Sequence, residues 1–525
     1  MAEKQWTPQQ RAAIEARGGT LLVSAAAGSG KTAVLVERVI GRILDPEHPV
    51  DADRLLIATF SNAAALEMKQ RIAARLNNLL VQHPEDARLQ RQQMLLARAQ
   101  IGTIHAFCGS LIRSNFQALG LPSNIRVADE KELEVLRQQA ARQVVEEFHS
   151  RGEETFLQLV ELLSSGRDDS RLFSTLFSLY DFVRSHPFYG RWLEEKLALY
   201  SGEVRVEDSA WGQVILSYAA DALDYAIAMT GQALEKIRRE ERMAKAYLEA
   251  FYQDLDQLEQ LRRTVSGRNW DQICAQLGGF TFAKLRPLRG EDGEKAAVQA
   301  LRAGVKKLVG DLREKQFCAT ASQFQEDVEF LRPMVAQLFS LVQAFDRAFT
   351  AAKLQRNAMD FSDMEQYAIA LLARPEGGGF VRTELARQVA AEYDELLIDE
   401  FQDTNAAQEI IFRAVSQNEQ NLFLVGDVKQ SIYRFRQARP ELFLEKKRRY
   451  YPYDGAHFPA KITLGKNFRS APQVTGWVNF LFTQLMSPQV GELDYDREEA
   501  LQPGAVFPEG SRPACQVRIL DLTGE

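Results

Sequence analysis

A glycine-rich loop between a strand and a helix constrains this chain more than any other feature of its sequence. Residues 24–32 read SAAAGSGKT, after the short apolar run TLLVS at 20–24 and before the helical pattern AVLVERVIGRIL. Small residues allow backbone N–H groups to close around phosphate oxygens at the positive end of the following helix. The segment therefore predicts a nucleotide-binding site built on a parallel α/β sheet.

The residue types within this loop predict separate roles. In loops of this pattern the lysine, here Lys31, reaches the β- and γ-phosphates, and the hydroxyl of Thr32 binds Mg²⁺. The chain has Ala25 where the general pattern G-x-x-x-x-G-K-[ST] has its first glycine. A chance glycine-rich loop is disfavoured, because the strand, the loop, the Lys-Thr pair and the helix all agree. The residues expected to contact the nucleotide here are Ala25, Ala26, Ala27, Gly28, Ser29, Gly30, Lys31 and Thr32.

Two adjacent acids at the end of another apolar run predict the second half of the site. Residues 396–404 read LLIDEFQDT. Because neighbouring side chains on a strand point to different sides, Asp399 can hold Mg²⁺ while Glu400 faces the attacking water. Alone, such a pair is usually a surface turn, but a phosphate loop upstream favours a catalytic pair. We expect Lys31 and Asp399 at the carboxyl ends of neighbouring strands.

Strand-like and helix-like patterns alternate near both ends of the chain, which predicts an α/β fold with doubly wound parallel sheets. Between about residues 125 and 355 amphipathic helical patterns dominate, so a helical domain is expected as an insertion. Acids and bases alternate along 231–265, which favours a solvated helix face over a DNA-binding surface. Besides 20–24, the short apolar runs lie at 54–60, 394–400, 421–426 and 461–464.

Composition sets broad limits on the class of protein. The 525 residues are too many for one ordinary core, so two to four domains are expected. The net charge of −7 gives no global sign of a nucleic-acid partner. No run is long and apolar enough for a membrane span and the polar start is no signal peptide, which predicts a cytoplasmic protein. No C-x-x-C pair occurs, so zinc and iron–sulfur sites are disfavoured; the four cysteines are Cys108, Cys274, Cys318 and Cys515.

Eight short motifs follow one another along the chain. They are WTPQQRAAI (6–14), SAAAGSGKTAVLVERV (24–39), LLIATFSNAAALEMKQRI (55–72), GTIHAFCGSLIR (102–113), MDFSDM (359–364), LLIDEFQDTN (396–405), LVGDVKQSIYRFRQARPELF (424–443) and ITLGKNFRSAPQV (462–474). In this order they resemble the superfamily-1 helicases of the UvrD and PcrA kind. The form GDVKQSIYRFR, with Val-Lys after the Asp, is similar to the AddA and RecB branch, and the whole series is most similar to AddA-type helicase–nucleases.

The resemblance implies a specific domain order. Residues 1–125 together with 355–445 would form a first RecA-like ATP-binding domain with the phosphate loop. Residues 126–354 would be the inserted helical accessory domain. Residues 446–525 would begin a second, truncated RecA-like domain, and we expect 460–525 to be poorly packed because most strands of that domain are missing.

The resemblance also assigns nucleotide contacts, with ATP and Mg²⁺ as the cofactors. It implies that Gln10 reads the adenine edge and that Phe468 stacks on the adenine ring. Gln430 would couple the γ-phosphate to the DNA track. Arg469 would act as an arginine finger, since a guanidinium that reaches the γ-phosphate only on domain closure joins hydrolysis to motion. The alternative for Arg469 is a surface arginine that caps a helix.

A DNA track follows from the same resemblance. Hydroxyl, amide and imidazole groups can hold phosphates without reading sequence, and aromatic rings stack bases with roughly 1–3 kcal/mol each. Phe60 at a strand end is alternatively a core residue, and His105 is alternatively buried. The expected DNA-binding residues are Thr59, Phe60, Asn62, Thr103, His105, Tyr433, Phe435 and Arg436.

The function implied by the resemblance is that of an ATP-dependent 3′–5′ DNA helicase or translocase, part of a larger complex, in double-strand-break repair and recombination. Its expected partners are single-stranded DNA, duplex ends and an AddB-like nuclease in a heterodimer, and its expected place is the bacterial cytoplasm, at the nucleoid. The chain reads as the N-terminal part of a longer protein that also carries a C-terminal nuclease. The alternative is a non-motor module that binds ATP and single-stranded DNA with little turnover, because Arg469 would not be held against the γ-phosphate.

Overall fold

A computed structural model describes residues 5–163, 169–202, 205–288, 293–488, 490–507 and 515–518. The chain divides into two compact units, and the division does not follow the sequence. The first unit combines Met1–Val144, Ser174–Tyr189 and Ala344–Glu525, and the second, here called the helical unit, combines Val145–Phe173 and Gly190–Gln343. Each chemically informative motif of the sequence lies in the first unit.

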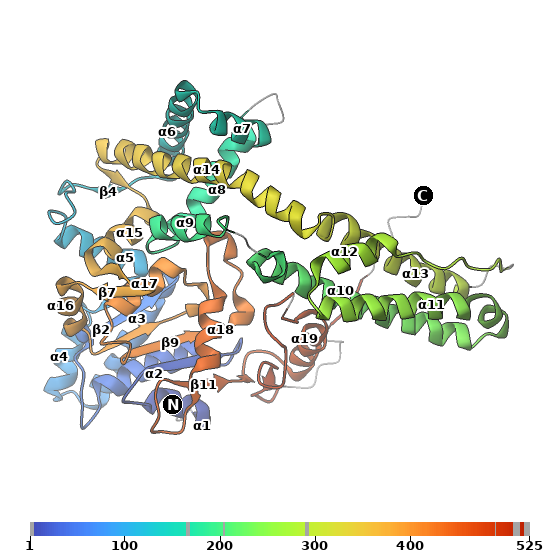
Figure 1. Cartoon of the computed structure of the whole chain (residues 1–525). Helices are drawn as coiled ribbons and strands as arrows, with labels where there is room; N and C mark the ends of the chain where they lie inside the picture. Colours follow the sequence, from blue (N-terminus) through green and yellow to red (C-terminus); the bar gives the residue numbers. More distant parts are fainter. Residues whose placement is uncertain are drawn as a thin grey trace. The chain divides into compact units, whose positions relative to one another are not determined.

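A seven-stranded parallel sheet organises the first unit, in the order β10-β11-β1-β9-β8-β2-β3 (Figure 1). Its central strands are buried on both faces, which explains their continuous apolar sequences. This confirms the predicted α/β class. The strands are β1 (Leu21–Ala25), β2 (Leu55–Thr59), β3 (Gln100–Thr103), β8 (Glu395–Ile398), β9 (Leu422–Gly426), β10 (Tyr451–Pro452) and β11 (Ala460–Leu464).

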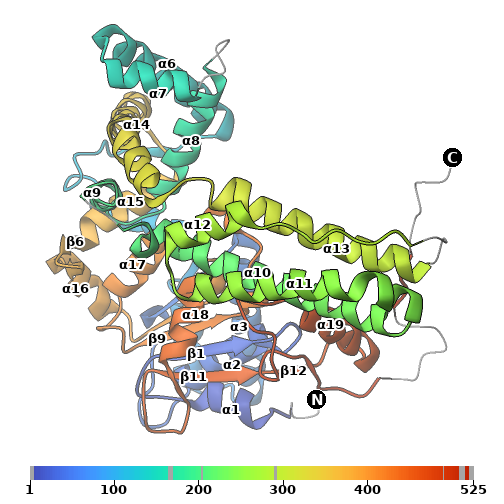
Figure 2. The same cartoon turned by 45° about the vertical axis from the view of Figure 1, so that its right-hand side comes forward.

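Helices cover both faces of this sheet (Figures 1 and 2). Strand alternation divides the core, because Leu21 and Val23 of β1 pack on one face while Leu22 packs on the other. The first face is covered by α1 (Pro8–Glu15), α2 (Lys31–Ile43), α3 (Asn62–Gln82) and α4 (Ala87–Leu95). The second is covered by α5 (Ile104–Ser114), α15 (Phe361–Leu372), α16 (Glu384–Glu392), α17 (Ala406–Ala414) and α18 (Pro440–Arg449).

The sheet extends further along the chain than the sequence predicted. The run at 461–464, expected to open a second domain, forms β11 and pairs directly with β1, with Val23 opposite Ile462. The predicted boundary at 446 and the predicted poor packing from residue 460 are therefore wrong for β11, whose Ala460 and Leu464 are buried. The apolar run had identified a buried strand correctly, but a strand's partner cannot be read from its own residues.

A second difference concerns the order of the central strands. Strand β9 lies between β1 and β8, so the strands that precede Lys31 and Asp399 are not neighbours. Beyond β11 the chain leaves the large sheet. The short strands β12 (Lys466–Asn467) and β13 (Gln502–Pro503) pair with each other, and α19 (Pro472–Leu485) lies between them in sequence.

The helical unit consists of long amphipathic helices, the type of secondary structure that the pattern of residues 126–354 predicted. Helices α10 and α11 lie side by side (Figures 1 and 2) and share a core that includes Leu223 and Leu258. Helices α6 (Glu130–Arg151), α8 (Ser170–Arg184), α9 (Tyr189–Ala198) and α14 (Ala321–Gln355) contain residues of both units. The other helices are α7 (Glu154–Leu163), α10 (Ala210–Arg238), α11 (Glu241–Ser266), α12 (Trp270–Gly279) and α13 (Gly293–Asp311).

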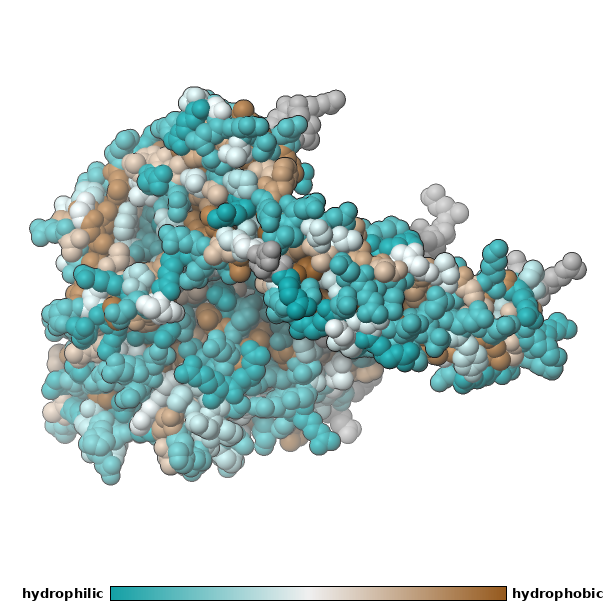
Figure 3. Space-filling view, in the orientation of Figure 1, coloured by the Kyte–Doolittle hydropathy of each residue, from teal (hydrophilic) through white to brown (hydrophobic). Residues whose placement is uncertain are grey.

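Within the described ranges, no helix is both long and apolar enough to cross a membrane. The face shown in Figure 3 is largely hydrophilic, with apolar residues scattered over it.

A buried ion pair fixes α2 against the centre of the sheet. The guanidinium of Arg38 in α2 donates to Oε1 of Glu395 in β8 at 2.8 Å and to the carbonyl oxygen of Ala13 in α1 at 2.7 Å. It also lies 4.1 Å from the ring centroid of Phe423 in β9. Burial lowers the pKa of Arg38, although Glu395 acts to raise it. The arginine therefore depends on this carboxylate for compensation.

We expect Glu395→Ala to destabilise the first unit by about 3–5 kcal/mol, because it leaves a buried guanidinium without its carboxylate. Urea unfolding followed by circular dichroism measures the change. The matched control is Glu67→Ala, which removes the partner of Arg71 in a pair that is about half exposed on α3. That change should cost about 0.5 kcal/mol or less. Similar costs for the two variants would contradict the assigned role of the buried pair.

Candidate functional site

The loop between β1 and α2 has the geometry of an anion-binding turn. Gly28 and Gly30 adopt positive φ angles of 70° and 84°, and Gly30 precedes the first turn of α2, which contains no acidic residue. The positive end of the helix therefore faces the loop without a competing carboxylate from its own first turn. Ala25 is the last residue of β1, in extended conformation, so an L-residue fits where the general pattern has glycine.

Lys31 and Glu400 meet although 369 positions separate them in the sequence. Nζ of Lys31 donates to Oε2 of Glu400 at 2.9 Å, and Nε2 of Gln402 donates to the same oxygen at 3.0 Å. The phosphate-loop lysine and the acidic turn after β8 thus converge at one edge of the sheet. Thr32, the second residue of α2, follows Lys31 directly.

The acidic turn is shaped by its backbone rather than by strand alternation. Strand β8 ends at Ile398, and Glu400 adopts a left-handed conformation with φ of 53°. The predicted reason for the different directions of Asp399 and Glu400 is therefore wrong, because neither residue lies in the strand. The backbone N–H of Asp399 donates to the carbonyl oxygen of Ala58 in β2 at 2.9 Å, which fixes where the turn begins.

Asp399 is largely buried, so its charged form is unfavourable unless a cation lies nearby. Burial, with the nearby charge of Glu400, raises the pKa of Asp399 to about 6. Among the described residues no cluster of three or more His, Cys, Asp or Glu side chains forms a complete metal cage. A site with one carboxylate and one hydroxyl still fits Mg²⁺, because this ion commonly binds one or two carboxylates together with phosphate oxygens and waters. Asp399 and Thr32 are the residues available for that purpose.

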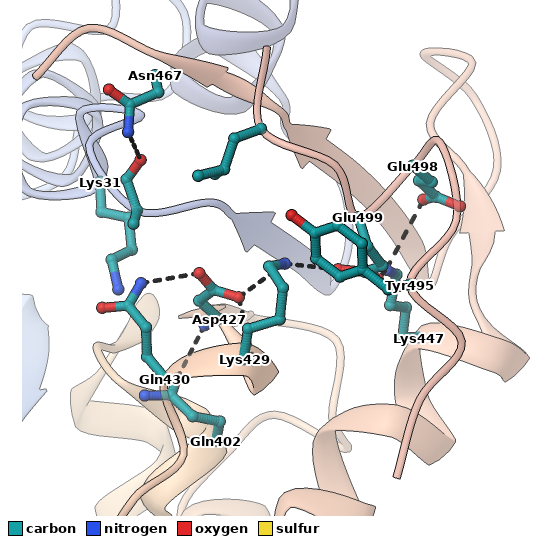
Figure 4. A network of polar contacts seen from close by, with 12 residues as sticks. Lys31, Gln402, Asp427, Lys429, Gln430, Lys447, Asn467, Tyr495, Glu498 and Glu499 are labelled. Carbon is teal, nitrogen blue, oxygen red and sulfur yellow. Dashed lines mark hydrogen bonds and ion pairs between the residues drawn. The ribbon is translucent and has the colours of Figure 1, made fainter. Parts of the chain in front are cut away.

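Gln430 is held by an acid that the sequence analysis did not single out. After β9, Nε2 of Gln430 donates to Oδ2 of Asp427 at 2.8 Å, and the backbone N–H of Asp427 donates to Oε1 of Gln402 at 3.0 Å (Figure 4). Gln402 therefore touches both Glu400 and the turn that carries Gln430. Asp427 and Gln402 lie inside recognised motifs, so their positions were visible in the sequence although their contacts were not.

The segment after β11 attaches directly to the phosphate loop. Nδ2 of Asn467 donates to the carbonyl oxygen of Ala27 at 2.7 Å. The backbone N–H of Phe468 donates to the carbonyl oxygen of Gly28 at 2.9 Å. The backbone N–H of Arg469 donates to Oδ1 of Asn467 at 2.9 Å, and the Arg469 side chain is exposed. The structure thus brings Phe468 and Arg469 beside the loop without a contact between the Arg469 guanidinium and Lys31.

A small cavity lies beside this segment and contains both residues expected at the adenine. Oε1 of Gln10 accepts the N–H of Thr7 at 3.0 Å, and Nε2 of Gln10 donates to the carbonyl oxygen of Ser29 at 2.9 Å, so the amide is fixed against the loop. The cavity measures about 210 Å³. Its lining is Thr7, Gln9, Gln10, Ser29, Thr463, Leu464, Gly465, Lys466, Phe468, Glu498 and Gln502.

A larger pocket of about 850 Å³ adjoins the acidic turn. Seven of the eight residues expected to bind DNA line it, and the eighth, Tyr433, packs on Phe60 with a ring separation of 4.5 Å. Sequence reasoning missed the contribution of the segment 174–189, which had no motif. The seven expected residues in the lining are Thr59, Phe60, Asn62, Thr103, His105, Phe435 and Arg436, and the missed ones include Asp181, Arg184 and Ser185.

An aromatic platform stands at one side of this pocket. The Arg436 guanidinium lies between 5.5 and 5.8 Å from the ring centroids of Phe60, Tyr433 and Phe435. Phe435 is 73% exposed, and Phe60 is partly exposed rather than a core residue. A cation among accessible rings can stack on bases and attract a phosphate backbone.

His105 is tied to a buried acid that also lines this pocket. Its Nε2 lies 3.0 Å from Oε1 of Glu365, which also accepts from Nε2 of Gln408 at 2.7 Å. Nδ2 of Asn405 donates to the other oxygen of Glu365 at 3.1 Å. His105 remains partly exposed at the pocket, so neither full burial nor a free imidazole describes it. Glu365 lies on α15 just after the motif at 359–364, so no motif marked it.

Comparisons with known proteins agree with this arrangement. A family model described as the UvrD/REP helicase N-terminal domain matches residues 6–451. A protein of Ruminiclostridium cellulolyticum, named as the A component of an ATP-dependent helicase/nuclease, is 39% identical over 519 residues, which cover 97% of this chain and 41% of the relative. Proteins of the same name from Geobacillus thermodenitrificans (39% identical, 99% and 42% covered) and Acetivibrio thermocellus (41% identical, 98% and 42% covered) are similar. The chain spans about two fifths of the length of these curated relatives.

Gly28→Ala should weaken nucleotide binding by about tenfold or more, which corresponds to about 1.4 kcal/mol. A Cβ at this position would lie 2.9 Å from both Cβ of Arg469 and Nδ2 of Asn467, so the segment beside the loop must shift. The control is Gly455→Ala, which has a positive φ of 91° but meets nothing within 4 Å. Titration with a fluorescent ATP analogue compares the two. If both variants lose the same affinity for ATP, the loss comes from backbone strain in general and not from contacts of the phosphate loop, which would contradict this prediction.

Proposed function

Since the chain belongs to the UvrD/REP helicase family, we propose that it provides the ATP-hydrolysing part of a DNA helicase. The observation that carries the proposal is the convergence of Lys31, Asp399 and Glu400 at one edge of the sheet. A lysine at the start of a helix, a buried carboxylate and a second carboxylate beside the lysine are the groups that phosphoryl transfer requires.

In the proposed reaction Lys31 exchanges its ion pair with Glu400 for the β- and γ-phosphates of ATP. Glu400, released from the lysine, accepts a proton from the attacking water or orients it. Thr32 and Asp399 would hold Mg²⁺, which when bound neutralises charge that develops on the phosphates. The ion pair at 2.9 Å supports this exchange, because it places the ammonium and the carboxylate in direct contact beside the phosphate loop.

The neighbouring residues have proposed roles in recognition and coupling. Phe468 stacks on the adenine and Gln10 reads its edge, and both line the cavity beside the loop. Gln430, in the turn after β9, couples the γ-phosphate to the DNA track. Arg469 serves as the arginine finger, since its backbone is anchored beside the loop while its side chain is exposed. The loop residues from Ala25 to Thr32 surround the phosphates.

Single-stranded DNA is the proposed occupant of the larger pocket. Thr59, Asn62, Thr103 and His105 would hold phosphates, and the aromatic platform around Arg436 would stack bases. All these contacts tolerate any sequence, as translocation requires. The first RecA-like domain of this motor would comprise 1–125 with the chain from 355 to the end of β11.

The wider role is proposed from the names of the relatives. We propose a 3′–5′ helicase or translocase that acts on duplex ends in double-strand-break repair and recombination, in the bacterial cytoplasm at the nucleoid. It would form a heterodimer with an AddB-like nuclease, within a protein that has its own C-terminal nuclease. Family membership favours this motor over a module that only binds ATP and single-stranded DNA.

ATP hydrolysis measured with and without single-stranded DNA tests the proposal. The chain should hydrolyse ATP faster with DNA. Lys31→Ala should abolish tight ATP binding, because it removes the positive charge that contacts the β- and γ-phosphates. Glu400→Gln should keep ATP binding at least as tight, since Lys31 loses its competing carboxylate, but should stop hydrolysis. The control Glu384→Gln removes an exposed carboxylate on α16. Equal loss of ATP affinity in the Lys31 and Glu400 variants would contradict their separate roles.

Phe435→Ala should weaken single-stranded DNA binding by about 1–3 kcal/mol, the usual worth of one stacked base, and leave ATP binding unchanged. Ile432→Ala is the control, because Ile432 is similarly exposed in the same segment but has no ring to stack. Fluorescence anisotropy with oligonucleotides at several salt concentrations measures both variants. A marked preference of the wild-type chain for one duplex sequence would refute the proposed track.

A further inference from the structure

We propose that Glu499 is a positioning residue that sets the orientation of Gln430 and links it to the segment that carries Arg469. This inference rests on the proposed function, because Gln430 and Arg469 take their roles from it. Glu499 lies beyond the part of the chain that the family model matches, and no motif includes it.

The contact runs through a buried lysine (Figure 4). Nζ of Lys429 lies 2.5 Å from Oε2 of Glu499 and 2.9 Å from Oδ1 of Asp427. The other oxygen of Asp427, Oδ2, accepts from Nε2 of Gln430 at 2.8 Å. Lys429 therefore holds one oxygen of Asp427 in a way that leaves the second for Gln430. Glu499 therefore acts on the side-chain amide of Gln430 through two intermediate side chains, Lys429 and Asp427.

Charge balance shows why Glu499 controls this arrangement. Two carboxylates, Asp427 and Glu499, compensate two lysines, Lys429 and Lys447, and all four side chains are largely buried. Glu499 divides its oxygens, with Oε2 toward Lys429 and Oε1 toward Lys447. Without this carboxylate, Lys429 would keep Asp427 as its acid, and Lys447 would keep a more distant one, Glu498, whose oxygen lies 4.0 Å from its Nζ. Lys429 would then compete with Gln430 for Asp427.

The chain at Glu499 leads into the strand pair β12 and β13, next to Phe468 and Arg469. The backbone N–H of Glu499 donates to Oδ1 of Asp496 at 3.1 Å. Three residues on, Gln502 donates its N–H to the carbonyl oxygen of Gly465 at 3.0 Å and begins β13, which pairs with β12. Strand β12 ends at Asn467, immediately before Phe468 and Arg469. A displacement of Glu499 would therefore move both the turn after β9 and the segment beside the phosphate loop.

Steady-state ATP hydrolysis by the full chain tests the inference. Glu499→Gln should lower kcat roughly 10- to 100-fold, as a small misplacement of a group near the reacting phosphate does, while KM for ATP changes less than about threefold. Glu499→Asp should restore part of kcat. Asp494→Asn is the matched control, since it makes the same chemical change at an exposed acid of the same segment, and should leave kcat unchanged.

A double-mutant cycle separates positioning from general stability. In a Gln430→Ala background Glu499→Gln should add little further loss of kcat, because both changes remove the same contact. Full multiplication of the two losses overturns the inference. If Glu499→Gln fails to fold, Lys429→Met/Glu499→Leu replaces the pair by apolar side chains of similar volume, and the same loss of kcat is expected. Normal kcat in that variant also overturns it.

The outcomes distinguish this inference from the proposed function. Hydrolysis by the wild-type chain together with undiminished kcat in Glu499→Gln overturns the role of Glu499 and leaves the proposed function in place. Absence of hydrolysis in the wild-type chain, with ATP bound, overturns both.

Discussion

The carboxyl edge of the parallel sheet is the constraint on which every part of the site depends. Parallel strands all end at the same edge, so the loops that follow them meet there whatever their distance in sequence. Lys31 follows β1, Asp399 follows β8, Asp427 follows β9 and Asn467 follows β11. Because β9 lies between β1 and β8, the turn that carries Gln430 is enclosed by the phosphate loop on one side and the acidic turn on the other.

The ion pair between Lys31 and Glu400 at this edge is suited to exchange its partner for a phosphate. The ion pair between Lys31 and Glu400 is incompletely buried, with 13% and 34% of the two side chains exposed, so its desolvation is partial. By contrast, Arg38 and Glu395 beneath the same sheet are almost fully buried, and that pair holds helix to strand. A phosphate group with several negative charges can displace one carboxylate from Lys31, whereas nothing has access to Arg38.

Local sequence patterns predicted much of the site, and long-range pairing explains what they missed. The residues from Ala25 to Thr32 form one continuous segment from the end of β1 to the start of α2, so their spacing alone was informative. The run at 461–464 was recognised as a strand, yet its place beside β1 depends on residues far away along the chain. Glu365 and Glu499 lie outside the motifs, and their partners come from other segments. An acid outside any motif has no characteristic spacing, so only the fold reveals what it contacts.

The acidic turn connects the nucleotide site with the larger pocket, and this gives the proposed coupling a physical route. Gln402 donates from one amide to Glu400 and to Asp403, which lines the larger pocket. Farther along the same turn, Asn405 donates to Glu365, which holds His105. When Lys31 leaves Glu400 for a phosphate, the carboxylate keeps only the Gln402 amide as its partner in this turn and is free to move. Under the proposed function, its movement shifts the residues that line the DNA track, so nucleotide and DNA act on the same short segment.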